Sequence, residues 1–236
     1  MVHAPSTGAE TRAAAPGGSA PVTGRRERKK QATRVALRQA ALRLAIQHGV
    51  ENVTVEQIAE EADIALRTFF NYFSSKEEAV LASAAAAAEG LIAEFRARPR
   101  TESVLHAFRE AVLIIMNQSY AASRDHIEAL RLIRKAPSLV PQQMAMIATQ
   151  EKALAEAIAE RVGLHTDPHR AGKEGPVYPM VCAAALLAAL RVVLDQWLEL
   201  AATPGQVPSA DALGQRCDAA ITELAAGLDR PGLTDT

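Results

Sequence analysis

Apolar residues recur every three or four positions along most of the chain, and this period predicts α-helices. Runs of β-branched residues alternating with polar ones, which predict strands, are absent from the sequence. Glycine and proline fall between long helical segments, where they favour turns. The pattern therefore predicts an all-α protein with helices at residues 29–48, 55–62, 66–73, 76–97, 102–121, 124–135, 138–162, 177–201 and 209–228.

The second and third of these helices carry the most specific local signals. Thr54 to Gln57 has the pattern of a capping box, in which the threonine side chain and the residue three positions later satisfy each other's amides. Asp63 to Ala65 leaves room only for a tight turn before the third helix. Two short helices joined in this way form a helix-turn-helix.

Composition and the lengths of the predicted helices divide the chain into three parts. Residues 1–24 are mostly Ala, Gly, Pro, Ser and Thr and predict a disordered tail. Residues 25–75 hold the three-helix helix-turn-helix head, a candidate DNA-binding domain. Residues 76–236 hold a six-helix body.

The third helix has one apolar side and one polar side. Four of the nine aromatic residues of the chain lie between positions 69 and 73. At about 100° per residue, Phe69 and Phe73 share the inward face, and Arg67, Thr68 and Asn71 lie outward. In the major groove an arginine pairs with guanine and an asparagine with adenine, while Leu66 or Thr68 suits a thymine methyl group.

Other residues are candidates for the sugar-phosphate backbone. Phe70 and Tyr72 flank the outward face, and Lys76 begins the next helix, where we expect unpaired amides after Ser74 and Ser75 to attract an anion. Between Arg25 and Arg43 the chain has eight Lys or Arg against the single acid Glu27, although its formal net charge is only -1. The candidate DNA-binding residues are Arg25, Arg26, Lys29, Lys30, Thr54, Leu66, Arg67, Thr68, Phe70, Asn71, Tyr72 and Lys76.

Alternative interpretations of the same features are weaker. An aromatic cluster alone is usually core, as Phe69 and Phe73 are here, and a base-stacking platform needs aromatics spaced across a sheet. A catalytic pocket has no support, because the six histidines are scattered and no nucleophile motif or phosphate-binding glycine loop occurs. We expect no catalytic residue, no metal site and no cofactor, and we expect the loop histidines His165 and His169 to be solvated polar residues. With two cysteines, no signal segment and charges interrupting the alanine-rich stretches, the sequence favours a cytoplasmic protein that does not span a membrane.

The stretch "TVEQIAEEADIALRTFFNYFSSKEEAV" resembles the DNA-binding head of TetR-type transcriptional regulators. The resemblance covers residues 31–81 and includes the capping threonine, the turn length, the aromatic positions and Lys76. Asp63 stands where the family usually has a turn glycine, and Ala65 where it usually has a capping serine. Phe70 replaces a more usual tyrosine and therefore lacks the hydroxyl group for one contact to DNA that the resemblance implies.

The body is expected to dimerise and to bind an effector. Residues 177–201 are almost wholly apolar or small, and by resemblance the last two helices pair with those of a second copy in a four-helix bundle. The segments "ALRLIRKAPSLVPQQMAMIATQEKALAEAIAERVG" and "AAALLAALRVVLDQWL" look like a TetR subgroup that includes mycofactocin-system regulators, for which acyl-CoA-like ligands are expected. Arg131, Arg134 or Lys135 would then meet a phosphate or nucleotide portion of the ligand. Arg191 and Asp195, however, are spaced to pair along a helix. Trp197 suits either packing or ligand contact, and each other candidate also suits ordinary core. The candidate ligand-binding residues are Phe95, Phe108, Met116, Asn117, Tyr120, Arg131, Arg134, Met144 and Trp197.

The patterns and the resemblance together predict a homodimeric, cytoplasmic, ligand-responsive repressor. Its expected partners are a palindromic operator in double-stranded DNA, a second copy of itself and a small hydrophobic or acyl-CoA-like effector, with no membrane. The alternatives are a constitutive DNA-binding regulator without an effector and a helical enzyme.

Overall fold

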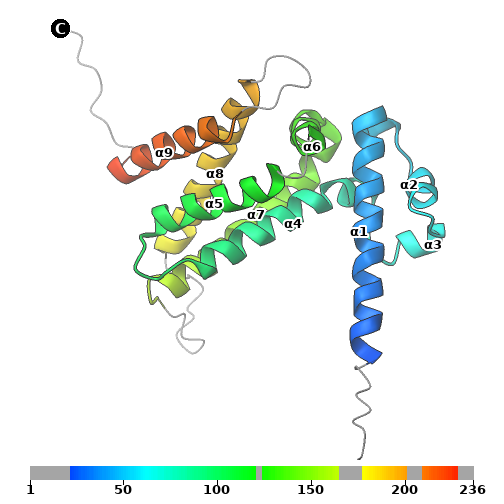
Figure 1. Ribbon diagram of the computed structural model, residues 1–236, viewed down its shortest axis with the longest axis horizontal. Helices are drawn as coiled ribbons and strands as arrows, with labels where there is room; N and C mark the ends of the chain where they lie inside the picture. Colours follow the sequence, from blue (N-terminus) through cyan, green and yellow to red (C-terminus); the bar gives the residue numbers. More distant parts are fainter. Residues whose placement is uncertain (1–21, 121–123, 165–176, 201–208, 228–236) are drawn as a thin grey trace, which may run out of the picture. The chain divides into compact units, whose positions relative to one another are not determined.

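The computed structural model describes residues 22–120, 124–164, 177–200 and 209–227, and within these ranges it contains helices and no strand (Figure 1). The all-α prediction is confirmed. The elements are α1 (Val22–His48), η1 (Val50–Asn52), α2 (Val55–Glu61), α3 (Leu66–Phe69), α4 (Lys76–Ala97), α5 (Val104–Tyr120), α6 (Arg124–Lys135), η2 (Pro137–Leu139), α7 (Val140–Arg161), α8 (Val177–Glu199) and α9 (Ala210–Ala226).

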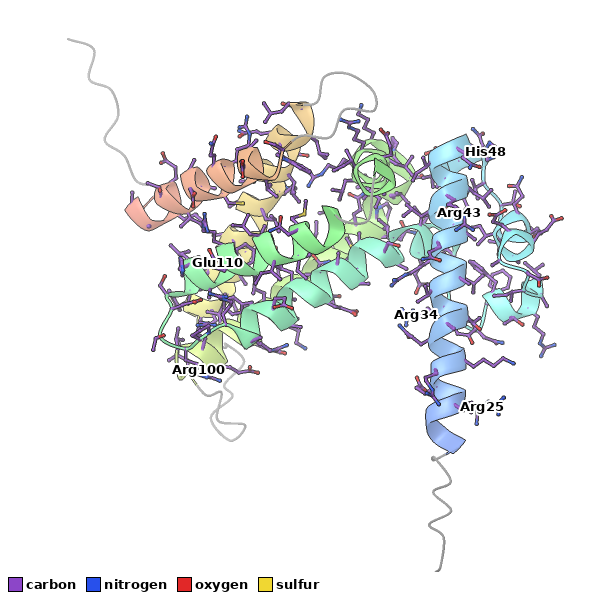
Figure 2. The ribbon with its side chains drawn as sticks, in the orientation of Figure 1. Arg25, Arg34, Arg43, His48, Arg100 and Glu110 are labelled. Atoms are coloured by element: carbon purple, nitrogen blue, oxygen red, sulfur yellow. The ribbon has the colours of Figure 1, made fainter. Side chains whose placement is uncertain are left out.

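The chain divides into two compact units, residues 1–35 and 36–236. In the first unit, the described residues form the beginning of α1, which starts at Val22 and thus before the predicted start at residue 29. The added residues 22–28 follow Pro21 and include three arginines and one glutamate, which are good helix formers. Its side chains from Gly24 to Ala32 are exposed, and Arg25 and Arg34 are labelled along it in Figure 2. Most of the predicted tail, residues 1–21, lies outside the described residues.

In the second unit, the end of α1 packs with α2, α3 and the start of α4 around one apolar cluster, which we call the head core. Phe69 and Phe73 are 0% and 2% exposed, so the predicted inward face of the third helix is confirmed. Ala136 and Leu139, from the corner between α6 and α7, also belong to the head core. The domain boundaries predicted at residues 24 and 75 stay a prediction. The head core contains side chains from before and after residue 75.

A second cluster, the body core, lies among α4, α5, α7, α8 and α9. Figure 1 shows α4 beside α5 and α7, and α9 beside α8. Gly90 of α4 lies close to α5, because a Cβ atom there would come within 3.2 Å of the Ile115 side chain. The body therefore has a tightly packed centre in which four predicted ligand residues are buried, namely Phe95, Phe108, Met116 and Trp197.

The helix α8 has an apolar surface on two opposite sides. Pro179, Ala183, Leu186, Val193 and Trp197 are buried in the body. The opposite side leaves apolar residues exposed, including Val177, Tyr178, Met180, Val181 and Val192. Among the described helices, α8 alone is long and apolar enough to cross a membrane, judged by length and composition only.

Candidate functional site

The capping box at the start of α2 is present as predicted. The Thr54 hydroxyl accepts a hydrogen bond from the Gln57 amide at 3.3 Å, and the Gln57 side chain accepts one from the Thr54 amide at 2.9 Å. Both side chains are therefore used to begin the helix. This role leaves the Thr54 hydroxyl with its own proton for a further acceptor.

The turn between α2 and α3 also forms as expected despite the missing glycine. Asp63 has a φ of 54°, the left-handed geometry that aspartate tolerates. The Asp63 amide donates to the Glu60 carbonyl at 2.9 Å, and the Ile64 amide donates to the Ala59 carbonyl at 2.9 Å. These two bonds make a Schellman motif, which ends α2 and turns the chain into α3. Ala65 supplies no side-chain cap to α3, as its identity implies.

The helix α3 is shorter than the predicted 66–73. It ends at Phe69, and the next residues continue in tighter turns, in which the Asn71 amide donates to the Thr68 carbonyl at 3.1 Å. Such 3₁₀-type bonds often close the last turn of a helix. Because the chain keeps turning in the same sense, Arg67 and Asn71 are exposed and Thr68 is half-buried.

The residues that flank this surface differ in exposure. Leu66 and Phe70 are exposed, whereas Tyr72 is half-buried and packs against the head core. The structure thus brings Leu66, Arg67, Phe70 and Asn71 together on one small exposed surface. Their role in DNA binding stays a prediction.

Lys76 is engaged within the protein. Its ammonium group donates to the Val53 carbonyl at 2.8 Å and to the Glu51 carbonyl at 3.2 Å. An ammonium group has three donors, so only one remains for the predicted phosphate contact. Lys76 therefore holds the loop before α2 against the start of α4.

The start of α4 already holds an anion of its own. Glu78 accepts hydrogen bonds from the amide and the hydroxyl of Ser74 at 2.7 and 2.6 Å, and its own amide donates to the Ser75 hydroxyl at 3.1 Å. The expectation of unpaired amides after Ser74 and Ser75 is therefore wrong for the Glu78 amide. A carboxylate at a helix start interacts favourably with the helix dipole and occupies the place proposed for a phosphate.

The basic residues Arg25, Arg26, Lys29 and Lys30 are exposed along the first unit. Arg28 donates from Nε to the Gly24 carbonyl at 3.1 Å within the same helix. At about 100° per residue, positions 25, 26, 28, 29 and 30 spread positive charge over an arc of about 200° of the helix, and Glu27 lies outside that arc. We call residues 25–30 the basic arm.

The predicted ligand-binding residues differ in their exposure. Phe95, Phe108 and Met116 are buried in the body core, whereas Asn117 and Met144 are exposed. The side chain of Tyr120 lies outside the described residues. Their shared role as a cavity lining stays a prediction.

The two arginines predicted to bind the ligand each form an ion pair within the protein. Arg131 pairs with Glu128 at 3.2 Å on the same helix, and Arg134 pairs with Asp195 of α8. Asp195 also lies 3.9 Å from Arg191, the spacing anticipated from the sequence. An anionic effector at Arg134 would have to compete with Asp195 for the guanidinium group.

Trp197 of α8 is buried and contacts the residue that precedes α9. Its ring is fully buried, and its Nε1 donates to the Ser209 carbonyl at 2.9 Å. This geometry favours the packing role over ligand contact, because the indole's single donor is already used.

A small apolar cavity of about 20 Å³ lies between α5, α8 and α9. Phe108, Leu190, Val193 and Cys217 are among its lining residues, and Phe108 is the single predicted ligand residue in that lining. Burial raises the pKa of the Cys217 thiol to about 11. The space suits about one water molecule, so this cavity in its present form holds no acyl chain.

Two polar contacts were not anticipated from the sequence. Arg161 at the end of α7 donates to the carbonyls of Phe95, Pro99 and Glu102, and burial lowers the pKa of its guanidinium group. Ser138 donates to the Glu51 carboxylate at 2.9 Å and so joins η2 to η1. Neither has a local sequence signal, because each pairs residues far apart in the chain.

No group of three or more His, Cys, Asp or Glu side chains that could hold a metal occurs in the described part of the chain. The loop histidines His165 and His169 lie outside it.

Known proteins and family models match most of the chain. Residues 37–83 match the family model of bacterial regulatory proteins of the tetR family, and residues 102–229 match the model of the MftR C-terminal domain. The chain is 32% identical to the HTH-type transcriptional regulator TcmR of Streptomyces glaucescens, over 89% of this chain and 92% of TcmR. It is 28% identical to a protein of Mycobacterium tuberculosis named as the mycofactocin biosynthesis transcriptional regulator MftR, over 86% of this chain and 94% of that protein.

Among solved structures, the fold resembles that of a TetR-family transcriptional regulator from Syntrophomonas wolfei. The TM-score is 0.59 at 18% identity, and the match covers 87% of this chain and 100% of the other. The relatives are transcriptional regulators rather than enzymes. This chain therefore belongs to the TetR family of transcriptional regulators, with a helix-turn-helix DNA-binding head and an MftR-type C-terminal domain.

Proposed function

We propose that the protein is a cytoplasmic, homodimeric repressor that leaves a palindromic operator when a small apolar or acyl-CoA-like effector binds its body. The DNA-binding part of the proposal rests on one observation, which is that α3 and the turn after it have one buried side and one exposed side. Phe69 and Phe73 are buried and anchor the segment, while Arg67 and Asn71 are exposed on its outer surface. This is the arrangement that a recognition helix needs in the major groove, since one side must be fixed and the other must reach base edges.

The exposed side of α8 supports the homodimer. Val177, Val181 and Val192 are exposed with small residues between them, so an apolar strip runs along the side opposite the body core. Such a strip is too extensive for a solvent-facing helix and suits a partner helix with the same surface. A second copy covers this strip in the proposed dimer and spaces two heads for two operator half-sites, which lie about 34 to 36 Å apart.

The effector class rests on the MftR-type body and on its flexible apolar side chains. Met116 in α5 and Met146 in α7 are the kind of adaptable residues that accept ligands of varied shape. Because the body core is closely packed, a ligand must open space there, and its binding energy then favours one arrangement of the helices over another. We propose that this second arrangement binds operator DNA less tightly.

A binding selection tests the proposal. Full-length protein is mixed with a library of random 30-base-pair duplexes, retained DNA is sequenced, and binding of the enriched duplex is measured by fluorescence anisotropy with and without long-chain acyl-CoA. A palindrome that is enriched and then released by acyl-CoA, but not by free CoA, supports the proposal. An enriched palindrome whose binding is indifferent to every acyl-CoA and hydrophobic compound tried favours the constitutive regulator instead.

A further inference from the structure

Leu66 and Phe70 form an exposed apolar pair on the DNA-facing surface of the head. They are 40% and 56% exposed, and they are the two exposed large apolar side chains between residues 24 and 117, where every side chain is described. The two residues are four positions apart, the spacing at which side chains on a helix are neighbours. The pair lies beside the polar residues Arg67 and Asn71, so this surface offers both apolar and polar contacts.

The Phe70 ring is held in position by the core beneath it. Its centroid lies 5.5 Å from that of Phe69 at an interplanar angle of 84°, an edge-to-face contact. The Phe69 ring is fully buried and lies 5.8 Å from the Phe73 ring. A ring supported in this way loses little freedom on binding, so it is suited to a specific contact.

The chemistry of phenylalanine limits what this ring can contact on DNA. It has no hydroxyl group and cannot donate a hydrogen bond to a phosphate. In the major groove the apolar group on a base edge is the C5-methyl group of thymine. Leu66 and Phe70 together offer an apolar surface beside the polar groups of Arg67 and Asn71, which suits a thymine next to the bases that those residues contact.

We propose that the Leu66 and Phe70 pair contacts the C5-methyl group of one thymine in each operator half-site and so sets the base preference at that position. This inference rests on the proposed DNA-binding function. It gives Phe70 a role in base recognition, because phenylalanine has no hydroxyl group with which to contact a phosphate.

Replacing thymine by deoxyuridine tests the contact, because this change removes the methyl group and keeps every hydrogen bond of the base pair. The probe is the duplex enriched from the random library, with each thymine replaced in turn and symmetrically in both half-sites. For the wild type we expect one thymine whose replacement weakens binding about fourfold per half-site, the effect of one buried methyl-sized group. The Phe70→Ala variant should bind the thymine and deoxyuridine duplexes equally.

Two further variants complete the design. Phe70→Leu keeps an apolar side chain and should retain part of the discrimination, and it replaces Phe70→Ala if that variant does not fold. Arg67→Ala is the matched control on the same helix, since it should weaken binding while leaving the ratio between thymine and deoxyuridine duplexes unchanged.

The outcomes separate the two proposals. If no duplex is enriched, the proposed operator binding fails. If a duplex is enriched but no thymine position distinguishes the two bases for the wild type, or if Phe70→Ala keeps the wild-type ratio, the methyl contact is overturned and operator binding stands. If Phe70→Tyr instead strengthens binding to all duplexes equally and steepens its salt dependence, the ring faces a phosphate and the inference is also overturned.

Discussion

The guanidinium group of Arg161 lies over the ring of Phe95, 4.8 Å from its centroid, and also donates to the Phe95 carbonyl at 2.9 Å. Arg161 ends α7, and the same group reaches the carbonyls of Arg98, Pro99 and Glu102 where α4 turns into α5. One side chain thus satisfies the end of one helix and the loop after it. These contacts fix the ends of three body helices against each other.

Replacing Arg161 by alanine should therefore lower the free energy of unfolding by about 3 kcal/mol, because several partly buried carbonyls lose their donor. The measurement is urea unfolding followed by circular dichroism. Arg100→Ala is the control, since Arg100 is exposed and donates to one carbonyl, that of Glu160, and a change of about 0.5 kcal/mol or less is expected for it. Equal losses for the two variants would contradict the anchoring role of Arg161.

The buried thiol of Cys217 predicts a change of stability in alkaline solution. Its pKa is raised from 9.0 to about 11 by burial, so the folded protein favours the neutral thiol. The stabilising effect is complete below pH 9 and is lost as the pH rises towards 11, because the unfolded chain releases the proton first.

We expect the difference in unfolding free energy between the wild type and Cys217→Ala to shrink by about 2 kcal/mol between pH 8 and pH 11. Cys182→Ala serves as the comparison, since the Cys182 thiol is only half-buried. A difference for Cys217→Ala that stays constant over this range would show that the thiol is not shielded in the folded protein.

A charge on the exposed strip of α8 should separate the proposed dimer. Val181 is 60% exposed and lies in the middle of that strip, so Val181→Glu would bury a carboxylate in each subunit of the dimer. The dissociation constant of the dimer should rise on the order of 100-fold, as measured by sedimentation equilibrium. Val140→Glu, at an exposed valine of α7, should leave the dimer intact. The α8 interface is refuted if Val181→Glu sediments as the wild-type dimer does.

The basic arm should supply sequence-independent affinity. Replacing Arg25, Arg26, Lys29 and Lys30 by alanine should weaken binding to all duplexes and reduce the slope of log affinity against log salt by about 0.9 for each phosphate that the arm no longer neutralises. The base preferences of the selected operator should not change. Arg100→Ala removes a charge from the body and should leave the slope as it is, and an unchanged slope for the arm variant would rule out phosphate binding by the arm.

The head could be predicted closely because its signals are local in the sequence. The capping box needs only Thr54 and Gln57, and the turn needs only an aspartate that accepts a positive φ at position 63. The helical period alone identified Phe69 and Phe73 as the buried face. What the pattern missed was the engagement of Lys76 with carbonyls of η1 and of the residue after it, which depends on the three-dimensional approach of two loops.

The body was less predictable because its contacts join distant residues. Arg134 and Asp195 are 61 positions apart, and nothing in either local segment indicates that they pair. Trp197 Nε1 donates to the carbonyl of Ser209, which follows the segment between α8 and α9. A helical wheel of α8 does not show this contact. A pattern of apolar residues also cannot separate a buried core residue such as Phe95 from an exposed one such as Met144.

The central claim is that the exposed surface of α3 recognises specific bases, and a base-by-base binding profile tests it most directly. Wild type and Arg67→Ala are each measured by fluorescence anisotropy against the selected operator and against every single-base change in one half-site. We predict that Arg67→Ala loses about 1 to 3 kcal/mol of discrimination at one guanine position and keeps the wild-type preferences elsewhere. A profile for Arg67→Ala that is uniformly weaker at all positions, with every base preference retained, would contradict the claim.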